Sequence, residues 1–171
     1  MPASAWVTRF SAFVRPGGEV LDLACGSGRH ARLFLSLGHP VVLVDRDVSG
    51  VTDLADKPSA ELIERDLEDG SGWPLEGRVF DAVVVANYLH RPLFTYILAA
   101  VAPGGLLIYE TFAVGNEKLG RPRKAEYLLR RGELVELLEP SFQVIAFEDV
   151  ELELPRAAVV QRIAARRLAQ L

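Results

Sequence analysis

The hydrophobic and polar positions along the chain follow two different periods, which predict alternating strands and helices. Short apolar runs bounded by glycine, proline or acidic residues predict strands at residues 19–24, 40–45, 60–65, 79–86, 106–112, 142–147 and 157–165. Apolar residues at helical spacing predict helices at residues 3–14, 29–37, 48–57, 92–102 and 133–138. This alternation is typical of a doubly wound α/β fold, in which a mostly parallel, here seven-stranded, sheet carries helices on both faces.

Two segments lack either period and are predicted to be loops. Residues 66–78 connect the third and fourth predicted strands, and residues 113–131 follow the fifth. The second segment is longer than a plain connection, which rarely exceeds about 12 to 15 residues. We therefore expect residues 113–131 to form a functional loop on the substrate side of the protein.

Length and composition indicate one globular domain, residues 1–171. A chain of 171 residues can bury roughly 70% of the surface that its unfolded form exposes. Apolar residues make up 50% and charged residues 25%, which is near the average for globular proteins. The net charge of -4 argues against a general nucleic-acid binder, so only a local basic patch could bind polyanions.

The cysteine and histidine content argues against disulfides and metal sites. Cys25 is the lone cysteine and cannot form an internal disulfide, and three histidines are a weak set of metal ligands. No apolar run reaches the roughly 18 residues of a membrane span, and residues 1–13 do not resemble a signal peptide. We expect a cytoplasmic protein without a metal or a membrane partner; the oligomeric state stays open.

The clearest motif is a strand that turns through two glycines into a helix, at residues 21–31. Gly26 and Gly28 allow a tight turn and a close approach to a ligand, and the free amides at a helix start attract negative or polar groups. Asp45 ends the next strand, roughly 20 residues later, where a carboxylate can accept hydrogen bonds from ribose hydroxyls. The combination predicts a nucleotide site.

The spelling of this motif does not decide which nucleotide binds. Residues 26–31 also satisfy the G-x-G-x-x-A form of the dinucleotide fingerprint. A nicotinamide-dependent oxidoreductase, with Arg46 holding a 2′-phosphate, is therefore one alternative.

The residues Asp22-Leu23-Ala24-Cys25-Gly26-Ser27-Gly28 resemble the first motif of class I S-adenosylmethionine-dependent methyltransferases, where an acid stands four residues before the first glycine. The resemblance spans about residues 19 to 112 and continues at residues 41–45, 65–68, 80–85 and 102–107. Residues 87–92 and 109–112 also look like small bacterial methyltransferases of the tellurite-resistance type. The resemblance implies a Rossmann-like methyltransferase fold with an antiparallel last strand.

The resemblance also implies S-adenosylmethionine as cofactor and a set of residues that bind it. Asp22 and Gly26 would support the methionine end, and Asp45 the ribose. Asp66 and Leu67 would bind the adenine, and Asn87 would lie near the sulfonium. The complete expected set is Asp22, Ala24, Gly26, Gly28, Asp45, Arg46, Asp66, Leu67 and Asn87.

Methyl transfer from a sulfonium is an in-line displacement, so the protein mainly has to position the nucleophile in a dry pocket. His90 and Tyr88 follow the fourth strand and are the candidates for a catalytic base. Tyr88 could equally be a pocket wall, and His90 could cap the helix at Pro92. Tyr88-Leu89 stands where enzymes that methylate adenine or glutamine amines have two prolines, so those substrates are not expected. A length of 171 residues leaves little room for an added substrate domain, which favours a small-molecule acceptor.

Several other residues have two interpretations each. Trp6, Phe10 and Phe13 form a helical stripe that belongs to the core or closes over the cofactor. His30 and His39 are expected at the surface or in helix caps, Cys25 in the packing of the loop. Glu110, at the end of the fifth strand, could face the substrate or pin the following loop.

A cluster of basic residues lies in the loop at residues 113–131. Such clusters are most often solvated surface, but this one could also grip an anionic small molecule or form a patch for RNA. A non-catalytic module that binds S-adenosylmethionine or RNA is therefore a further alternative. The cluster comprises Lys118, Arg121, Arg123, Lys124, Arg130 and Arg131.

Overall fold

The computed structural model describes residues 1–138 and 140–169; positions 139, 170 and 171 of the predicted domain lie outside the described residues. The strands are β1 (Val20–Leu23), β2 (Val41–Asp45), β3 (Ala60–Glu64), β4 (Phe80–Ala86), β5 (Val101–Phe112), β6 (Phe142–Leu152) and β7 (Ala158–Arg167).

The helices are short. The α-helices are α1 (Ala5–Ser11), α2 (Arg29–Ser36), α3 (Phe94–Ala99) and α4 (Glu133–Leu137), and the 3-10 helices are η1 (Ser49–Leu54), η2 (Arg91–Leu93), η3 (Asn116–Lys118) and η4 (Ala125–Tyr127). None of the described helices is long and apolar enough to cross a membrane.

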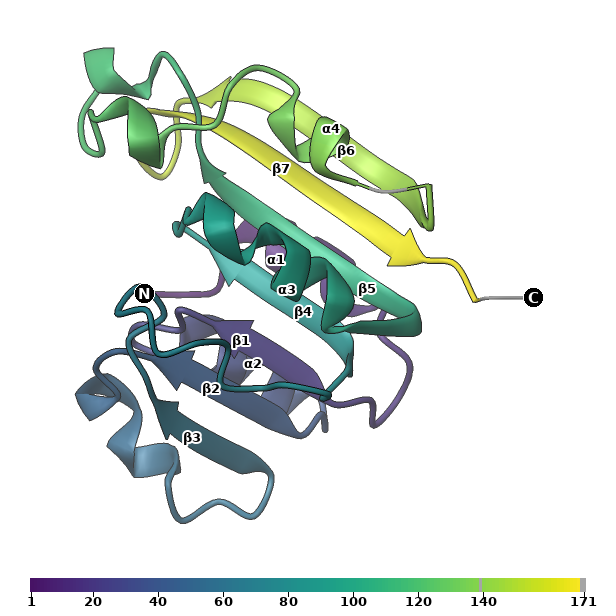
Figure 1. Cartoon of the computed structure of the whole chain (residues 1–171). Coiled ribbons are helices and arrows are strands. Elements are labelled where there is room, and N and C mark those ends of the chain that lie inside the picture. Colours follow the sequence, from purple (N-terminus) through teal and green to yellow (C-terminus); the bar gives the residue numbers. More distant parts are fainter. Residues whose placement is uncertain (139, 170–171) are drawn as a thin grey trace.

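All seven strands form one sheet in the order β3-β2-β1-β4-β5-β7-β6. Strands β1 to β5 are parallel, and β7 runs antiparallel between β5 and β6 (Figure 1). The predicted α/β class, the mostly parallel sheet and the antiparallel last strand are therefore confirmed. Because the chain moves outward from β1 to β3 and then crosses to β4, the strand order reverses between β1 and β4, where such sheets bind ligands.

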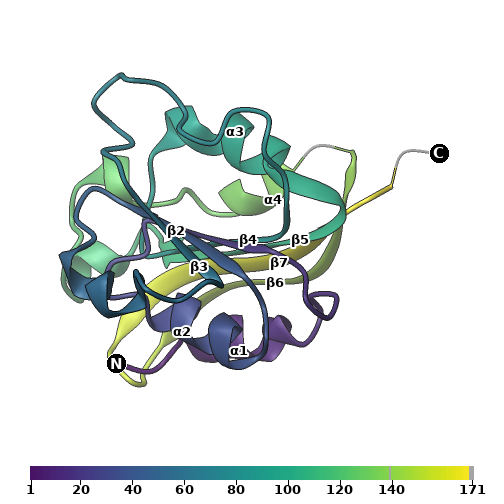
Figure 2. The same ribbon diagram turned by 90° about the horizontal axis from the view of Figure 1, so that it is seen from below.

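Helices cover both faces of the sheet. Helices α1 and α2 lie on one face, and α3 and α4 lie on the other (Figure 2). The central strands are buried on both sides, which explains why they read as continuous apolar runs rather than alternating ones. One core contains Leu21, Val83 and Tyr109, and the other contains Phe10, Phe34 and Val84.

Some predicted boundaries were wrong because pairing along the sheet overrides local signals. Strand β5 begins at Val101 rather than at residue 106, since Val101 pairs with Phe80 before a shift in register. The helix predicted over 92–102 is divided into η2 and α3 and ends at Ala99. Strand β6 continues to Leu152 because it pairs with β7 over that length.

The N-terminal helix belongs to the core. Trp6 and Phe10 are buried, and the Trp6 indole N–H donates to the Ile163 carbonyl at 3.2 Å. Phe13 departs from the predicted stripe, because it lies beyond the end of α1 and is 44% exposed. The structure thus favours the core interpretation of this stripe.

An ion pair anchors the loop at residues 113–131. Arg91 in η2 donates to both carboxylate oxygens of Glu133, at 2.7 and 3.0 Å. The same guanidinium donates to the carbonyls of Glu126 and Leu128, at 2.9 Å each. Although burial acts to raise the pKa of Glu133, the hydrogen bond from Arg91 holds that pKa below its ordinary value. The loop is therefore held against the segment that follows β4.

Gly28 permits the close packing of η1 against the start of α2. It has a φ of +68°, and a Cβ at this position would come within 2.5 Å of the buried Val51 side chain. Gly17 has a similar φ of +70°, but a Cβ there would meet nothing within 4 Å. Substitution at Gly17 would therefore cause backbone strain alone, whereas substitution at Gly28 would add steric overlap.

We predict that Gly28→Ala destabilises the protein more than Gly17→Ala. Left-handed backbone costs about 1 to 2 kcal/mol at either site, and overpacking against Val51 adds about 1 to 3 kcal/mol at Gly28 only. Urea unfolding followed by circular dichroism measures both free energies. Equal losses in the two variants would contradict the close packing at Gly28.

Candidate active site

The Asp22 carboxylate completes the start of α2. The N-cap of this helix is Gly28, which has no side chain to accept from the free amides of the first turn. Asp22, buried at 1% exposure in β1, instead accepts from the Ala31 N–H at 2.9 Å. Burial raises the pKa of Asp22 to about 7, although the bond from Ala31 and the charge of Arg29 lower it. Asp22 therefore holds the start of α2, and with it the glycine turn, against β1.

The Asp45 carboxylate binds the backbone of the same turn. One of its oxygens accepts from the Gly26 N–H at 2.8 Å, and the other accepts from the Asp47 N–H at 3.1 Å. Each carboxylate oxygen keeps a further lone pair for a ligand. The end of β2 is thereby fixed beside the loop that follows β1.

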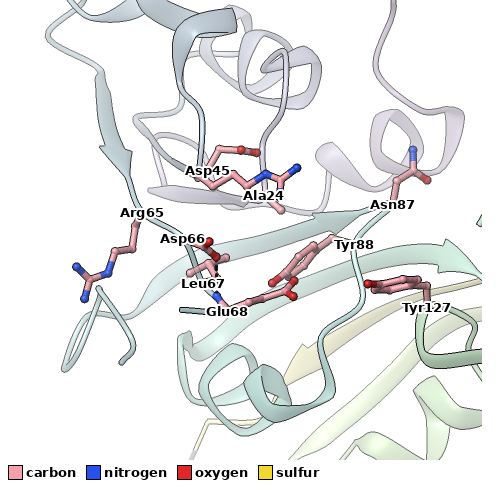
Figure 3. A pocket seen from close by; sticks show the side chains of 10 residues that line it. Ala24, Asp45, Arg65, Asp66, Leu67, Glu68, Asn87, Tyr88 and Tyr127 are labelled. Atoms are coloured by element: carbon pink, nitrogen blue, oxygen red, sulfur yellow. Dashed lines mark hydrogen bonds between the residues drawn. The ribbon is translucent and has the colours of Figure 1, made fainter. Parts of the chain in front are cut away.

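A cavity of about 460 Å³ lies at the carboxyl ends of β1, β2, β3 and β4 (Figure 3). Its volume falls in the range of about 300 to 1,000 Å³ that small-molecule sites occupy. This first cavity is lined by Ala24, Asp45, Arg46, Arg65, Asp66, Leu67, Glu68, Asn87, Tyr88 and Tyr127.

Backbone strain is concentrated at this cavity. Ala24 and Asn87 have positive φ values, 53° and 55°, and both line the first cavity. Such conformations cost free energy for residues other than glycine and are frequent at functional sites. Because Ala24 follows β1 and Asn87 follows β4, the strain lies on either side of the point where the strand order reverses.

A second cavity of about 210 Å³ adjoins the first. Glu68, Asn87, Tyr88 and Tyr127 line both cavities, and their positions define the boundary between them. The remaining lining residues of the second cavity are Leu89, Thr111, Phe112 and Pro122. Two small molecules bound in these cavities would therefore meet at the four shared residues.

Three oxygen-bearing side chains converge at this boundary. Figure 3 shows the Glu68 carboxylate between the rings of Tyr88 and Tyr127. The Tyr88 hydroxyl is buried beside the Glu68 carboxylate, and burial, reinforced by the charge and the hydrogen bonding of Glu68, raises the pKa of Tyr88. The Nδ1 of His90 lies 3.8 Å from a Glu68 carboxylate oxygen.

The structure brings most of the predicted binding residues together. The first cavity is lined by Ala24, Asp45, Arg46, Asp66, Leu67 and Asn87 from that set, and also by Tyr88, a candidate base. Asp22 and Gly28 do not line it, because Asp22 points to α2 and Gly28 packs against Val51. Gly26 contributes its backbone N–H, which donates a hydrogen bond to the Asp45 carboxylate. His90 lines neither cavity, and its side chain forms no helix cap.

Sequence reasoning missed the residues that the long loop supplies. Tyr127 and Pro122 lie among the basic residues of the segment 113–131, and both line the second cavity. Glu68 belonged to a motif assigned to adenine binding and lines both cavities. The position of Asp66-Leu67-Glu68 after a strand was the available signal, since it places Glu68 at the ligand edge.

His30 and His39 were expected at the surface or in helix caps; both are buried, so the surface alternative was wrong. His30 accepts from the Ser4 N–H at 3.3 Å, and burial lowers the pKa of His30 to about 4. His39 lies 2.9 Å from the Gly18 carbonyl. Cys25 is buried in the loop as expected, and burial raises the pKa of its thiol to about 12.

Glu110 is buried on the face of α1 rather than in either cavity. Burial raises the pKa of Glu110 above its ordinary value, although a hydrogen bond with Ser4 and the charges of Arg162 and Arg29 act to lower it. Glu110 lines neither cavity. Its Cα partner on β7 is Arg162, which pairs with Glu148 at 2.7 Å. Glu110 therefore belongs to the packing around the N-terminal segment.

The strand order, the glycine turn after β1 and the acid that ends β2 define the class I methyltransferase fold. Among solved structures, TehB from Haemophilus influenzae superposes with a TM-score of 0.78 at 17% identity, over 96% of this chain and 62% of that one. A methyltransferase from Methanosarcina mazei superposes with a TM-score of 0.73 at 18% identity, over 99% and 100%. At such low identities, these superpositions establish the fold alone.

The chain belongs to the family described as methyltransferase domain, whose model matches residues 20–105. The predicted resemblance to class I methyltransferases is thereby confirmed. A protein-L-isoaspartate O-methyltransferase of Chlorobaculum tepidum is 30% identical over 71% of this chain and 54% of its own length. The C-methyltransferase UbiE of Ectopseudomonas mendocina is 35% identical over 63% and 47%. The chain thus spans about half the length of these relatives.

We predict that Asp22→Asn removes a pH-dependent part of the stability. Because burial raises the folded pKa of Asp22 from 3.8 to about 7, its contribution is full below pH 4 and is lost as the pH rises through 7. The loss is on the order of a few kcal/mol. His30 gives an opposite slope at low pH, since its pKa is lowered to about 4.

The measurement is therefore a difference between wild type and Asp22→Asn, in which the His30 contribution cancels. Urea unfolding between pH 4 and 8 gives both free energies. We expect the advantage of wild type to shrink steadily as the pH rises. A constant difference would show that Asp22 ionises normally in the folded protein.

Proposed function

We propose that this protein transfers a methyl group from S-adenosylmethionine to a small-molecule acceptor. The observation that carries the proposal is the pair of adjoining cavities at the reversal of strand order, with four residues common to both. One cavity has the volume of a cofactor site and the other is smaller. Membership of the methyltransferase domain family supports this assignment.

The residues of the first cavity fit the chemistry of S-adenosylmethionine. Asp45 offers carboxylate lone pairs to ribose hydroxyls, while Asp66 and Leu67 offer a polar and an apolar group to an adenine. Gly26 would meet nothing within 4 Å if it carried a Cβ, so the space beside its backbone is open. Bound there, the sulfonium supplies an electrophilic methyl group.

The work of the protein is to position the acceptor and to exclude water. The second cavity holds the acceptor against Tyr88 and Tyr127, so that its nucleophilic atom faces the boundary with the first cavity. Asn87, with its strained backbone, stands at the same boundary near the sulfonium position. Tyr88 is in place for direct contact, whereas His90 reaches the boundary only through Glu68.

The size of the second cavity supports a small acceptor. Its 210 Å³ leaves room for a ring or a short chain, and its walls come from the β4 segment, β5 and the long loop. We include in the proposal that residues 1–171 act as one domain, with residues 113–131 as the substrate loop. Solved neighbours include a 1,6-didemethyltoxoflavin-N1-methyltransferase from Burkholderia thailandensis and a glycopeptide N-methyltransferase.

The oxidoreductase alternative has less support. Arg46 does line the first cavity, where a 2′-phosphate on a ribose near Asp45 would meet it. The family model and the curated relatives, however, are all methyltransferases. The basic residues of the long loop do not line the cavities, so an RNA-binding surface has no support from the site.

We expect the protein to bind S-adenosylhomocysteine and to transfer labelled methyl groups. Titration calorimetry with S-adenosylhomocysteine, NADH and NADPH compares the cofactors directly. Transfer from labelled S-adenosylmethionine is then screened against amines, phenols, thiols, metalloid oxyanions and bulk RNA. Heat with a nicotinamide cofactor only would reject the proposal, and binding without transfer to any acceptor would favour a non-catalytic module.

Asp45→Ala should weaken S-adenosylhomocysteine binding by about 1.5 to 3 kcal/mol, the usual scale for a hydrogen bond to a charged group. The matched control is Asp69→Ala, which removes an exposed carboxylate that bonds only its own turn at Ser71. Calorimetry on the three proteins gives the affinities. Unchanged affinity in Asp45→Ala would place the ribose elsewhere.

A further inference from the structure

The second cavity, where we place the acceptor, is lined by one charged residue. Among its described lining residues this is Glu68, and its charge is negative. The basic side chains of the surrounding loop are absent from the lining, including Arg121 and Arg123 on either side of Pro122. An anionic nucleophile would therefore meet a carboxylate at the boundary between the cavities, and like charges repel.

Local contacts fix the position of Glu68. The Asp66 carboxylate accepts from the Glu68 N–H at 2.9 Å and closes a tight turn after β3. The His90 Nδ1 lies 3.8 Å from a Glu68 carboxylate oxygen. The turn thus holds the backbone of Glu68, and its side chain, 44% exposed, extends toward Tyr88 and Tyr127 (Figure 3).

The Tyr88 hydroxyl lies at the same place. It is buried, and the group beside it is the Glu68 carboxylate, which raises the pKa of Tyr88 through its charge and through hydrogen bonding. Tyr88 and Glu68 both line the two cavities, so a ligand at the boundary meets a hydroxyl and a carboxylate together. Oxygens of both groups can accept, so a ligand N–H suits this pair.

The walls of the second cavity favour a flat acceptor. Tyr88, Phe112 and Tyr127 contribute aromatic rings, and Pro122 contributes a rigid apolar surface. Aromatic side chains pack against planar rings in offset or edge-to-face arrangements. The volume of 210 Å³ limits the buried part of the acceptor to a small ring system.

We propose that the acceptor is a planar aromatic or heteroaromatic amine, and that Glu68 binds its N–H and takes its proton. This inference rests on the proposed function. In the transfer, the nitrogen lone pair forms the N–C bond while the C–S bond breaks and leaves its electron pair on sulfur. The proton of the newly cationic nitrogen passes to the Glu68 carboxylate, and His90, which is partly exposed, can pass it to solvent.

The first test is a binding measurement that needs no turnover. Benzamidinium and benzoate have similar flat shapes and opposite charges, and each is titrated into protein saturated with S-adenosylhomocysteine. We expect benzamidinium to bind at least about tenfold more tightly than benzoate, and Glu68→Gln to weaken benzamidinium by about tenfold. Tighter binding of benzoate, or an unchanged benzamidinium affinity in Glu68→Gln, would overturn the inference.

The matched control is Glu126→Gln. Glu126→Gln removes the same charge from the long loop rather than from the turn after β3, and the Glu126 side chain is exposed, pairs with Lys124 at 3.7 Å and does not line the cavities. We expect Glu126→Gln to keep the wild-type preference within about twofold. A loss equal to that of Glu68→Gln would mean that overall loop charge, not Glu68, makes the preference, and would overturn the inference.

The second test compares methyl transfer to aniline, phenol and thiophenol, which share one ring. Transfer to nitrogen should dominate in wild type, and Glu68→Gln should reduce the nitrogen-to-oxygen ratio by about tenfold. Preferred transfer to oxygen or sulfur would overturn the inference and leave methyl transfer standing, as would silence of nitrogen acceptors beside active others. Failure to bind S-adenosylhomocysteine would instead reject the proposed function and this inference with it.

Discussion

Two buried or half-buried carboxylates supply the acceptors that the glycine turn cannot supply for itself. The N-cap of α2 is Gly28, which has no side chain, so the free amides of the first turn need partners from elsewhere. Asp22 accepts from Ala31 beneath the turn, and Asp45 accepts from Gly26 above it. Because Asp45 also ends β2, the second bond ties two neighbouring strands into one ligand edge. The first cavity depends on that arrangement.

The second cavity depends on a different long-range contact. Arg91, just after β4, binds Glu133 and two carbonyls of the long loop. This bond network holds the stretch containing Tyr127 near the end of β4, where Tyr88 stands. The acceptor side of the site therefore combines a residue from a sheet strand's end with residues nearly 40 positions away. A parallel sheet makes this possible because its carboxyl ends share one edge.

The sequence predicted correctly those site residues whose positions depend on neighbouring residues in the chain. The glycine turn, the acid at the end of β2 and the residues after β3 and β4 all follow short apolar runs, and they meet in the first cavity. His90, a candidate base or helix cap from the sequence, lines neither cavity and forms no side-chain cap, because sequence spacing does not reveal side-chain direction after a strand ends. Strand β5 was drawn too short, because pairing with β4 extends it through Pro103 and two glycines.

Local sequence was enough to predict the alternation of strands and helices, the glycine turn and the class of ligand that such a turn attracts. These features follow from local conformational preference and hydrophobic period, which neighbouring residues decide. The roles of Asp22 at the start of α2, and of Glu68 and Tyr127 in the lining of both cavities, became visible in the folded protein alone. Those roles arise from contacts between segments far apart in the chain, and side-chain direction at such contacts is set by packing rather than by spacing.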